Sequence, residues 1–365
     1  MKNETPTNLT DEEALDYLRT RIRASGEHPE RRPIEREWAS NQAYFAGQQF
    51  HVNDSTGLHF PKRQNPDRYV ANKIIVKVFR AVAKLLQVNA QFHVIPDEPD
   101  FLSRQGAKIA QEAYEHLKVV TRWRTKKLTT LLQAAIFGSA FNKVTWNPLA
   151  GNMDRVYFNS ETDKTPNINA LADHELRQKL ELAGAFEDTF SGEIEIRIPT
   201  PYQMWWDPNC RTDLPDCNWM NQRTYPYVED VRADFREQII ARHGHEGLDK
   251  LHAGEDDTGA EFLERQIAFM AQRVDGGFQV SVEHEQLVGK RLRMDEYWER
   301  PAARNKMRGR RILVAGDLVI DQGPNPYAAA ELAIPFHKTD WFEFPGRFIG
   351  LSLVGQLRGP QRAYN

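Results

Sequence analysis

The sequence lacks the features that mark secreted, membrane-bound or disulfide-stapled proteins. Only two cysteines, Cys210 and Cys217, occur in 365 residues. They argue against a disulfide framework and fit a reducing compartment. The longest apolar runs are far shorter than a membrane-spanning helix, and the polar start, Met1–Thr10, does not resemble a signal peptide. We therefore expect no membrane partner.

An excess of charge of one sign is also missing. The formal net charge of −3 excludes a strongly basic protein that condenses nucleic acid, although it allows local basic stripes. With 40% hydrophobic and 27% charged residues, the composition is that of an ordinary globular protein. The length is sufficient for two or three modules with a real core.

Catalytic motifs are absent as well. The sequence has neither a phosphate-binding loop nor a dinucleotide-binding glycine motif. Gly350–Gly355 resembles a nucleophile elbow, but its second glycine comes one residue late, and we interpret Ser352 as the start of a helix. The histidines of His243–Glu246 are better explained by exposure or helix capping than by zinc, and the two cysteines do not fit a zinc ribbon. We therefore predict no catalytic, metal-binding or cofactor-binding residue, and no enzyme.

Hydrophobic periodicity predicts a largely helical first half. Thr10–Glu13 forms a capping box for a helix that ends at Gly26, and the charged, proline-containing Glu27–Pro33 indicates a linker. A later helix is expected to end at Gly244. The other expected helices are Ile34–Phe45, Ala71–Val88, Ser103–Val120, Trp123–Phe137 and, as a mostly helical stretch, Ile168–Glu187.

Alternating and β-rich runs predict strands. We expect Ala140–Trp146 and Met153–Phe158 to pair as a hairpin through a turn at Asn147–Gly151, and a second tight turn at Gly316–Asp317. The other expected strands are Phe92–Pro96, Glu193–Pro199, Phe278–Glu283, Leu292–Trp298, Ile312–Ala315, Leu318–Asp321 and Pro335–Phe344. The close spacing of the last five predicts a small antiparallel, SH3-like barrel.

The helix Ala71–Val88 combines two faces. Its apolar positions are Ile74, Val78, Val82 and Leu85. Its basic positions are Lys73, Lys77, Arg80 and Lys84, which fall within an arc of roughly 60°. A solvated face is the simplest interpretation of the basic positions. Because no acidic residue is interleaved at i+4, an anion-binding face stays open as the alternative.

The densest basic run, Arg300–Arg311, lies between two expected strands and is therefore expected at a hairpin tip. Its candidate interface or DNA-proximal residues are Arg304, Lys306 and Arg308. Phosphate contacts need only exposed cations and carry no sequence information. An exposed loop without a ligand is the simpler alternative.

The stretch Trp205–Trp206–Asp207–Pro208 is the most informative motif. Two adjacent tryptophans directly after an alternating strand indicate a packed interface or a tight local cluster. We predict that at least one indole is buried. We also predict that Asp207 and Pro208 fix the following turn, because proline presets φ and aspartate bonds the backbone. Such aromatic packing points to a structural or assembly protein.

The order of these segments resembles the portal protein of short-tailed bacteriophages. The resemblance spans roughly Trp38 to Asn365, and its specificity comes from order and spacing. The segments that carry it are Trp38–Gln49, Asn72–Ile74, Ala134–Ala140, Ile198–Tyr202, Trp206–Pro208, Glu296–Glu299, Phe348–Ser352, Gln361 and Asn365. The family continues into stem, clip, tunnel-loop and crown elements. We therefore expect the chain to be a fragment, with the channel-lining residues mostly beyond Asn365.

The resemblance implies a homo-oligomeric ring, usually a dodecamer, at one capsid vertex, through which double-stranded DNA is packaged and ejected. It implies contacts with the major capsid protein, with terminase and later with a tail adaptor, and a location in the virion after assembly in the host cytoplasm. A conduit should hold DNA weakly and non-specifically, which suits a near-neutral chain. Eight Trp and 11 Tyr suit large lateral interfaces.

The resemblance also implies how an α+β fold is divided along the chain. Residues 1–33 form an N-terminal arm or helix and linker, 34–190 a mainly helical region with a β-hairpin, 191–349 an α+β wing-like region with the small barrel, and 350–365 the start of a stem helix. The basic face of Ala71–Val88 is expected to meet acidic surface of a neighbouring subunit or partner rather than DNA, because the family's channel elements come later.

The last segment, Gly350–Asn365, is expected to be helical from Ser352. Gly359–Pro360 should kink or break this helix near Arg358. As the beginning of a stem, the segment should project from the body and be ordered only in the oligomer, since so short a helix is marginal alone.

Two other interpretations stay open. One is a metal-dependent DNA-processing enzyme, which would need a convergent carboxylate–lysine or histidine cluster. The acidic pairs at Asp97–Glu98, Asp213 and Asp216, and Asp256–Asp257 are more simply explained as solvated loop charges. The other is a non-viral scaffold that binds partner helices through Ala71–Val88.

Overall fold

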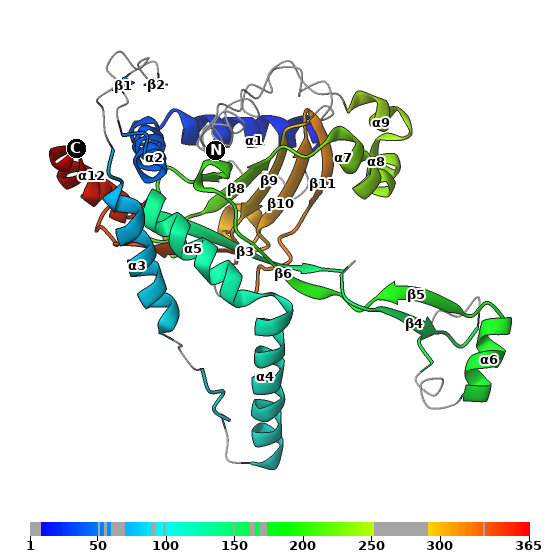
Figure 1. Ribbon diagram of the computed structural model, residues 1–365. Helices are drawn as coiled ribbons and strands as arrows, with labels where there is room; N and C mark the ends of the chain where they lie inside the picture. Colours follow the sequence, from blue (N-terminus) through cyan, green and yellow to red (C-terminus); the bar gives the residue numbers. More distant parts are fainter. Residues whose placement is uncertain are drawn as a thin grey trace, which may run out of the picture. The chain divides into compact units, whose positions relative to one another are not determined.

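The computed structural model has mixed α and β structure, so the expected α+β class is confirmed (Figure 1). It describes residues 9–49, 52–54, 57–59, 70–88, 92–97, 100–148, 150–160, 165–167, 174–251, 291–330 and 333–365. The chain folds as two compact units. The first comprises residues 1–91, 124–142 and 198–365, and the second residues 92–123 and 143–197. The division into four successive regions stays a prediction.

The first unit contains the largest sheet and most of the helices. Its helices are α1 (Asp11–Gly26), α2 (Arg31–Ala46), α3 (Lys73–Gln87), α5 (Trp123–Phe137, which begins at the unit boundary), α7 (Val228–Asp234), α8 (Arg236–His243), α9 (Glu246–Lys250) and α12 (Leu353–Tyr364). Its strands are β1 (Val52–Asp54), β2 (Gly57–His59), β7 (Met204–Trp206), β8 (Trp219–Thr224), β9 (Met294–Glu299), β10 (Arg310–Ala315), β11 (Leu318–Gly323) and β12 (Phe336–Asp340).

Five of these strands form an antiparallel sheet in the order β11–β10–β9–β8–β7. α1 lies across one face of this sheet (Figure 1), where Leu18 and Ile22 pack against Trp219 and Tyr297. Because side chains alternate along a strand, the neighbouring residues face the other way. Met220 is one of them, and it joins a second apolar core that includes Trp38 of α2.

The expected SH3-like barrel is wrong. β11 and β7 are the two edges of the sheet, and the described part of the chain contains no closed barrel. The strand expected over Pro335–Phe344 is β12, which lies beside a strand of another sheet, β3 (Ser139–Asn147). The strand expected over Phe278–Glu283 lies outside the described residues. Apolar layers cover both faces of the five-stranded sheet. Its side chains are therefore buried without closure of the sheet into a barrel.

The tight hairpin expected at Gly316–Asp317 is confirmed. Ala315 pairs with Leu318 across the end of β10 and β11. Gly316 has a φ of 61°, a value that favours glycine at the first central position of a two-residue hairpin loop. The sequence therefore specified both the position of this turn and its chemistry.

The second unit contains α4 (Phe101–Val120), α6 (His174–Leu182) and a long two-stranded arm. The expected hairpin between Ala140–Trp146 and Met153–Phe158 is wrong, because the strands pair with later partners. β3 pairs with β6 (Glu193–Arg197), and β4 (Met153–Tyr157) pairs with β5 (Phe186–Phe190).

Two glycines explain this pairing. Gly151 and Gly192 have φ values of 91° and 72° and interrupt the two sides of the arm at the same level. The Gly192 N–H donates to the Ala150 carbonyl at 2.9 Å, so the outgoing chain continues along the arm instead of turning back. A Cβ at Gly192 would lie 2.2 Å from the Trp146 ring, which is why a side chain does not fit there.

Several expected element limits also change. The linker expected over Glu27–Pro33 is shorter, because α2 already begins at Arg31. Proline is tolerated in a first helical turn, whose N–H groups have no intrahelical partner. Phe92–Pro96 is not a strand. The helix that ends at Gly244 is divided at Phe235 into α7 and α8.

The stretch Ile168–Glu187 is helical only in α6 among its described residues. Its last residues already belong to β5. By contrast, the helices expected over Ser103–Val120 and Trp123–Phe137 are confirmed as α4 and α5, and the capping box at Thr10–Glu13 is present at the start of α1.

α12 contradicts the expectation of a projecting, broken helix. Ser352 caps it as expected, but the helix runs from Leu353 to Tyr364 without a break at Pro360 and packs against α2 and α3. Pro360 is exposed, where a missing N–H is tolerated. The far end is held by Gln361, whose amide donates to the Ala71 carbonyl at 2.9 Å and accepts from the Lys73 N–H at 3.0 Å.

We expect the α12 amides to be protected from hydrogen exchange in a monomeric preparation, because Val354 is buried between α2 and α3. Ser352→Ala should lower the free energy of unfolding by about 1–2 kcal/mol. Its hydroxyl accepts from the Gly355 N–H and from the Asn41 amide, both at 2.8 Å. Denaturant unfolding of the Ser352→Ala variant measures this loss of free energy. Fast exchange over Val354–Leu357 in the monomer would contradict the packing.

Candidate functional site

Arg31 is buried beside the two adjacent tryptophans, with 3% of its surface exposed. Its guanidinium lies 4.7 Å from the ring centre of Trp205 and 4.6 Å from that of Trp206, within the range of cation–π attraction. It donates to the Met204 carbonyl at 2.9 Å and pairs with Glu35. Burial lowers the pKa of Arg31, and Glu35 opposes that effect. Because the sequence placed Arg31 in a linker, this residue was missed.

The predicted burial of at least one tryptophan is confirmed. Trp206 is 8% exposed, and its ring centre lies 6.5 Å from that of Trp38 and 5.1 Å from that of Phe348. Trp205 points to the opposite face of β7 and packs, half-buried, against the core under α1. The two adjacent indoles therefore connect the two apolar cores on either side of the sheet.

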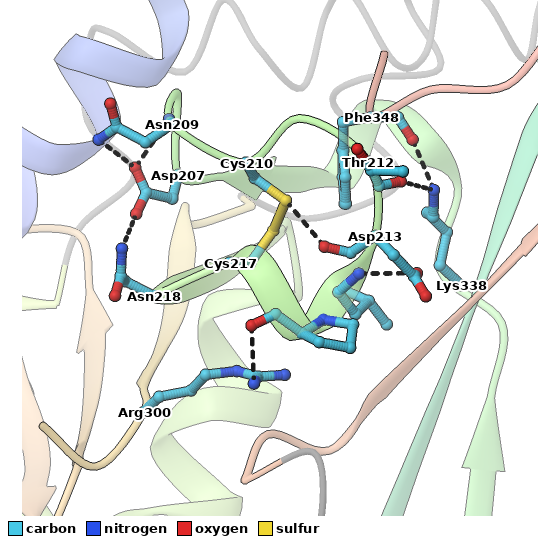
Figure 2. Close-up of a disulfide and its surroundings, with 12 residues drawn as sticks. Asp207, Asn209, Cys210, Thr212, Asp213, Cys217, Asn218, Arg300, Lys338 and Phe348 are labelled. Carbon is cyan, nitrogen blue, oxygen red and sulfur yellow. Dashed lines mark hydrogen bonds between the residues drawn. A yellow bond between two sulfur atoms is a disulfide. The ribbon is translucent and has the colours of Figure 1, made fainter. Parts of the chain in front are cut away.

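Asp207 fixes the turn after β7, as predicted (Figure 2). Its carboxylate is buried and accepts hydrogen bonds from the backbone N–H and the side-chain amide of Asn209, each at 3.0 Å. It also accepts from the Asn218 amide at 2.8 Å. The Asp207 carbonyl accepts from the Cys210 N–H at 2.9 Å. Pro208 lies inside this turn.

Cys210 and Cys217 form one disulfide (Figure 2), whereas the sequence was interpreted as having no disulfide framework and as suited to a reducing compartment. Their Cα atoms lie 4.8 Å apart, and both residues are buried. The short 3-10 turn Leu214–Asp216 brings the ends of this loop together. The number of cysteines excluded a framework of several bridges, but it did not exclude one local bridge.

The basic face of α3 is exposed as predicted. Ile74, Val78 and Val82 are buried, whereas Leu85, expected with them, is exposed. The cations Lys73, Lys77, Arg80 and Lys84 are all exposed. Within the described part of the chain, none of the four forms an ion pair. Lys73 lies 5.4 Å from the Tyr364 ring centre. Among the described residues, the positive charges of this face are therefore not neutralised by ion pairs.

The second basic site is the β9–β10 connection, which confirms the expected hairpin tip. Lys306 and Arg308 are exposed there, and the backbone of Arg304 lies in a 3-10 turn, while its side chain is outside the described part of the structure. Buried Asn305 holds this loop together, because its side-chain oxygen, Oδ1, accepts a hydrogen bond from the Ala302 N–H at 2.7 Å. No sequence motif indicates that role.

The ends of the same basic run are used within the fold. Arg311 pairs with Asp321 at 2.7 Å, and Arg300 donates to the Pro215 carbonyl at 3.2 Å. Burial lowers the pKa of Arg300. These arginines therefore stabilise the loop, and the cations left for a partner are those at its tip. No hydrogen bond or ion pair among the described residues joins this tip to the α3 face.

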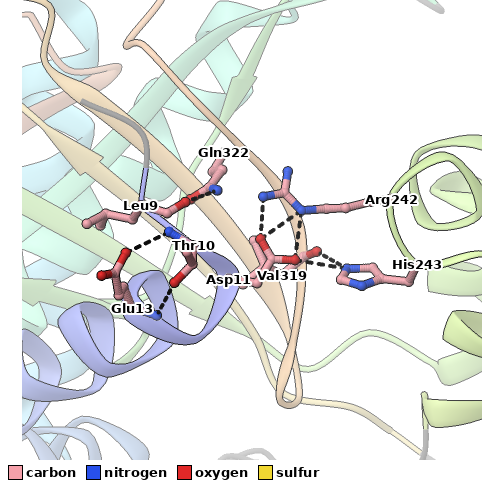
Figure 3. Close-up of polar contacts among 8 residues, drawn as sticks. All are labelled: Leu9, Thr10, Asp11, Glu13, Arg242, His243, Val319 and Gln322. Atoms are coloured by element: carbon pink, nitrogen blue, oxygen red, sulfur yellow. Dashed lines mark hydrogen bonds and ion pairs between the residues drawn. The ribbon is translucent and has the colours of Figure 1, made fainter. Parts of the chain in front are cut away.

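His243 contributes to the contacts of α8 with β11 and with the start of α1, where its Nε2 lies 3.8 Å from Asp11 (Figure 3). Its Nε2 lies 2.7 Å from the Val319 carbonyl oxygen, to which it donates in the tautomer that carries a proton there. Arg242 pairs with Asp11, and this hydrogen bond is the main reason why the pKa of Asp11 is lowered. This histidine therefore has a structural hydrogen bond.

The described residues contain no group of three or more histidine, cysteine, aspartate or glutamate side chains placed to hold a metal ion. No helix in that part of the chain is both long and apolar enough to span a bilayer. No protein-family model matches the sequence, and no curated protein matches it.

Proposed function

We propose that the chain is a non-enzymatic subunit of a bacteriophage portal ring, which forms the conduit for double-stranded DNA at one capsid vertex. In this role it would assemble with identical copies, usually twelve in the family it resembles. It would then contact the major capsid protein, the packaging terminase and later a tail adaptor. The order of sequence motifs from Trp38 to Asn365 supports this assignment.

The observation that carries the proposal is the exposure of the apolar side chains of α4. This helix has 20 residues, and none of them is buried. Its most exposed apolar side chains are Phe101 (78%), Leu102 (75%), Val119 (77%) and Ile109 (60%). Leu102 and Ile109 lie seven residues apart and therefore share one face. An apolar stripe of this kind favours burial against another protein surface.

In a ring, a second copy of the chain would cover this apolar stripe of α4. α3 adds a surface of another kind, with four exposed cations beside the exposed ring of Phe79. Phe79 and Arg80 are of the residue types enriched in interface cores, and the three lysines add positive charge that complements an acidic partner surface. We propose that the α3 face meets acidic surface of a neighbouring subunit.

The direct test is the oligomeric state of the purified chain, measured by light scattering coupled to size-exclusion chromatography and by negative-stain imaging. We expect rings with a central channel, in contrast to a monomer of 42.2 kDa. A monomer at every concentration tested would contradict the proposal.

Two variants locate the ring interface. Leu102→Glu/Ile109→Glu should abolish rings and leave a folded monomer, because each substitution places a charge on the proposed buried stripe. Arg104→Glu, exposed on the opposite face of α4, is the control for a charge change on this helix and should assemble normally. Lys77→Glu/Arg80→Glu should lower ring yield, with Arg32→Glu on α2 as its control. Unchanged ring yield in the α4 double variant would exclude this helix from the interface.

A further inference from the structure

A cleft lies between α1 and the five-stranded sheet of the first unit, on the face that α1 covers. Its α1 wall includes Arg19 and Arg23, and its sheet wall includes Arg223, Arg293 and Asp295. The floor is apolar and includes Leu18, Ile22 and Val314. The cleft has a volume of about 210 Å³ and an open mouth. None of these residues belongs to the basic sites described above.

The sheet wall is held rigidly. Arg223 donates to both carboxylate oxygens of Asp295 at 2.9 and 3.1 Å, and its guanidinium lies 4.9 Å from the Trp205 ring centre. Arg293 donates to the Gly316 carbonyl at 3.2 Å, and its Nε lies 3.4 Å from Asp295. Two guanidinium groups are therefore oriented before any ligand arrives, which lowers the entropic cost of binding.

The α1 wall has donors to spare. Arg19 pairs at 2.7 Å with Asp317, an exposed carboxylate at the rim, and an exposed pair of this kind is easily exchanged for a better acceptor. Arg23 is exposed and has no acceptor among the described residues. The cleft therefore has four positively charged guanidinium groups, and two carboxylates lie beside them, those of Asp295 and Asp317. The excess is two positive charges.

We propose that this cleft binds a terminal phosphate group, either in a monoester or as the free phosphate ion. A phosphate monoester carries close to two negative charges at neutral pH, which matches the excess of two positive charges in the cleft. A single carboxylate would neutralise only one of these charges. Guanidinium groups bind phosphate oxygens in a bidentate manner. The apolar floor strengthens these contacts, because it excludes water from one side. The phosphate could belong to a free nucleotide or phosphate ion, or to the 5′ end of a DNA strand. The site does not depend on ring assembly.

Titration calorimetry with three probes tests the site and separates the sources of phosphate. The probes are inorganic phosphate, a short single-stranded oligonucleotide with a 5′-phosphate, and the same oligonucleotide with a 5′-hydroxyl. Binding of inorganic phosphate assigns a small-ion site. Binding of the 5′-phosphorylated strand alone assigns a site for DNA ends. Equal affinity for the two oligonucleotides, or no heat with any probe, would overturn the proposal.

The variant Arg19→Gln/Arg23→Gln should weaken binding of the active probe at least about tenfold, the effect expected when charge-assisted hydrogen bonds are lost. Both side chains are exposed, so the fold should persist. Arg32→Gln, an exposed arginine outside the cleft, should bind like the wild type. For the wild type, affinity for the 5′-phosphorylated oligonucleotide should rise between about pH 5 and pH 7 as its terminal phosphate monoester loses its second proton near pH 6. Equal weakening in both variants would show that only general charge matters, which also overturns the proposal.

Discussion

Trp206→Ala is expected to lower the free energy of unfolding by about 3–5 kcal/mol, the usual cost of truncating a large aromatic side chain in a core. Trp206 is buried against Trp38 and Phe348. It also forms one side of the cation–π environment of Arg31. The substitution therefore leaves a cavity and weakens the surroundings of a buried charge. Denaturant unfolding should be followed by circular dichroism, because the variant loses an indole fluorophore.

Phe344→Ala is the matched control, because it truncates an aromatic side chain that is exposed in the same unit. Its cost should stay within about 1 kcal/mol. Trp205→Ala should fall between the two, since Trp205 is half-buried. If Trp206→Ala cost no more than Phe344→Ala, the tryptophan pair would not connect the two cores of the sheet.

Local signals in the sequence predicted local structure well. The capping box at Thr10, the glycine that ends α2 at Gly47 and the cap at Ser352 each depend on residues within a few positions. The turn at Gly316 is similar, because the required φ restricts the residue that can occupy it. These features were therefore readable without knowledge of the fold.

Pairing between distant segments was not predictable in the same way. The strand Ser139–Asn147 has a period and composition that suit any antiparallel partner, and the nearer strand was chosen instead of Glu193–Arg197. Gly151 and Gly192 lie on opposite sides of the arm. They can affect strand pairing only after the two sides of the arm have come together. Likewise, Val354 and Leu357 lie three residues apart and so share one apolar face of α12, but no local signal indicates that α2 and α3 cover it.

The candidate sites show the same difference between features set by local sequence and features set by contacts between distant segments. The exposure of Lys77 and Arg80 followed from the helical period. Burial of Arg31 did not, because a charged residue beside prolines is usually a solvated linker residue. The cleft lined by Arg23 and Arg293 joins residues about 270 positions apart, and no motif in either segment indicates it.

Lys338→Met is expected to cost about 3–5 kcal/mol of unfolding free energy, the range for breaking a buried ion pair from one side. The Lys338 side chain is 3% exposed. Its ammonium donates to the Thr212 carbonyl at 3.0 Å and to the Phe348 carbonyl at 2.7 Å (Figure 2), and it also donates to Asp340 at 2.8 Å. All three of its donors are therefore used, and its removal leaves a largely buried carboxylate without its cation.

A double-mutant cycle separates the ion pair from the packing of the lysine stem. Asp340→Asn keeps the size of the side chain and can still accept from the Ser139 hydroxyl, which bonds Asp340 at 2.5 Å in the wild type. The double variant Lys338→Met/Asp340→Asn should be less destabilised than the two single effects added together, because the neutral amide no longer needs a cation. Denaturant midpoints of the four proteins give the coupling free energy. Strict additivity would mean that Lys338 stabilises the β12 region through its two carbonyl contacts alone, with no contribution from the charge of Asp340.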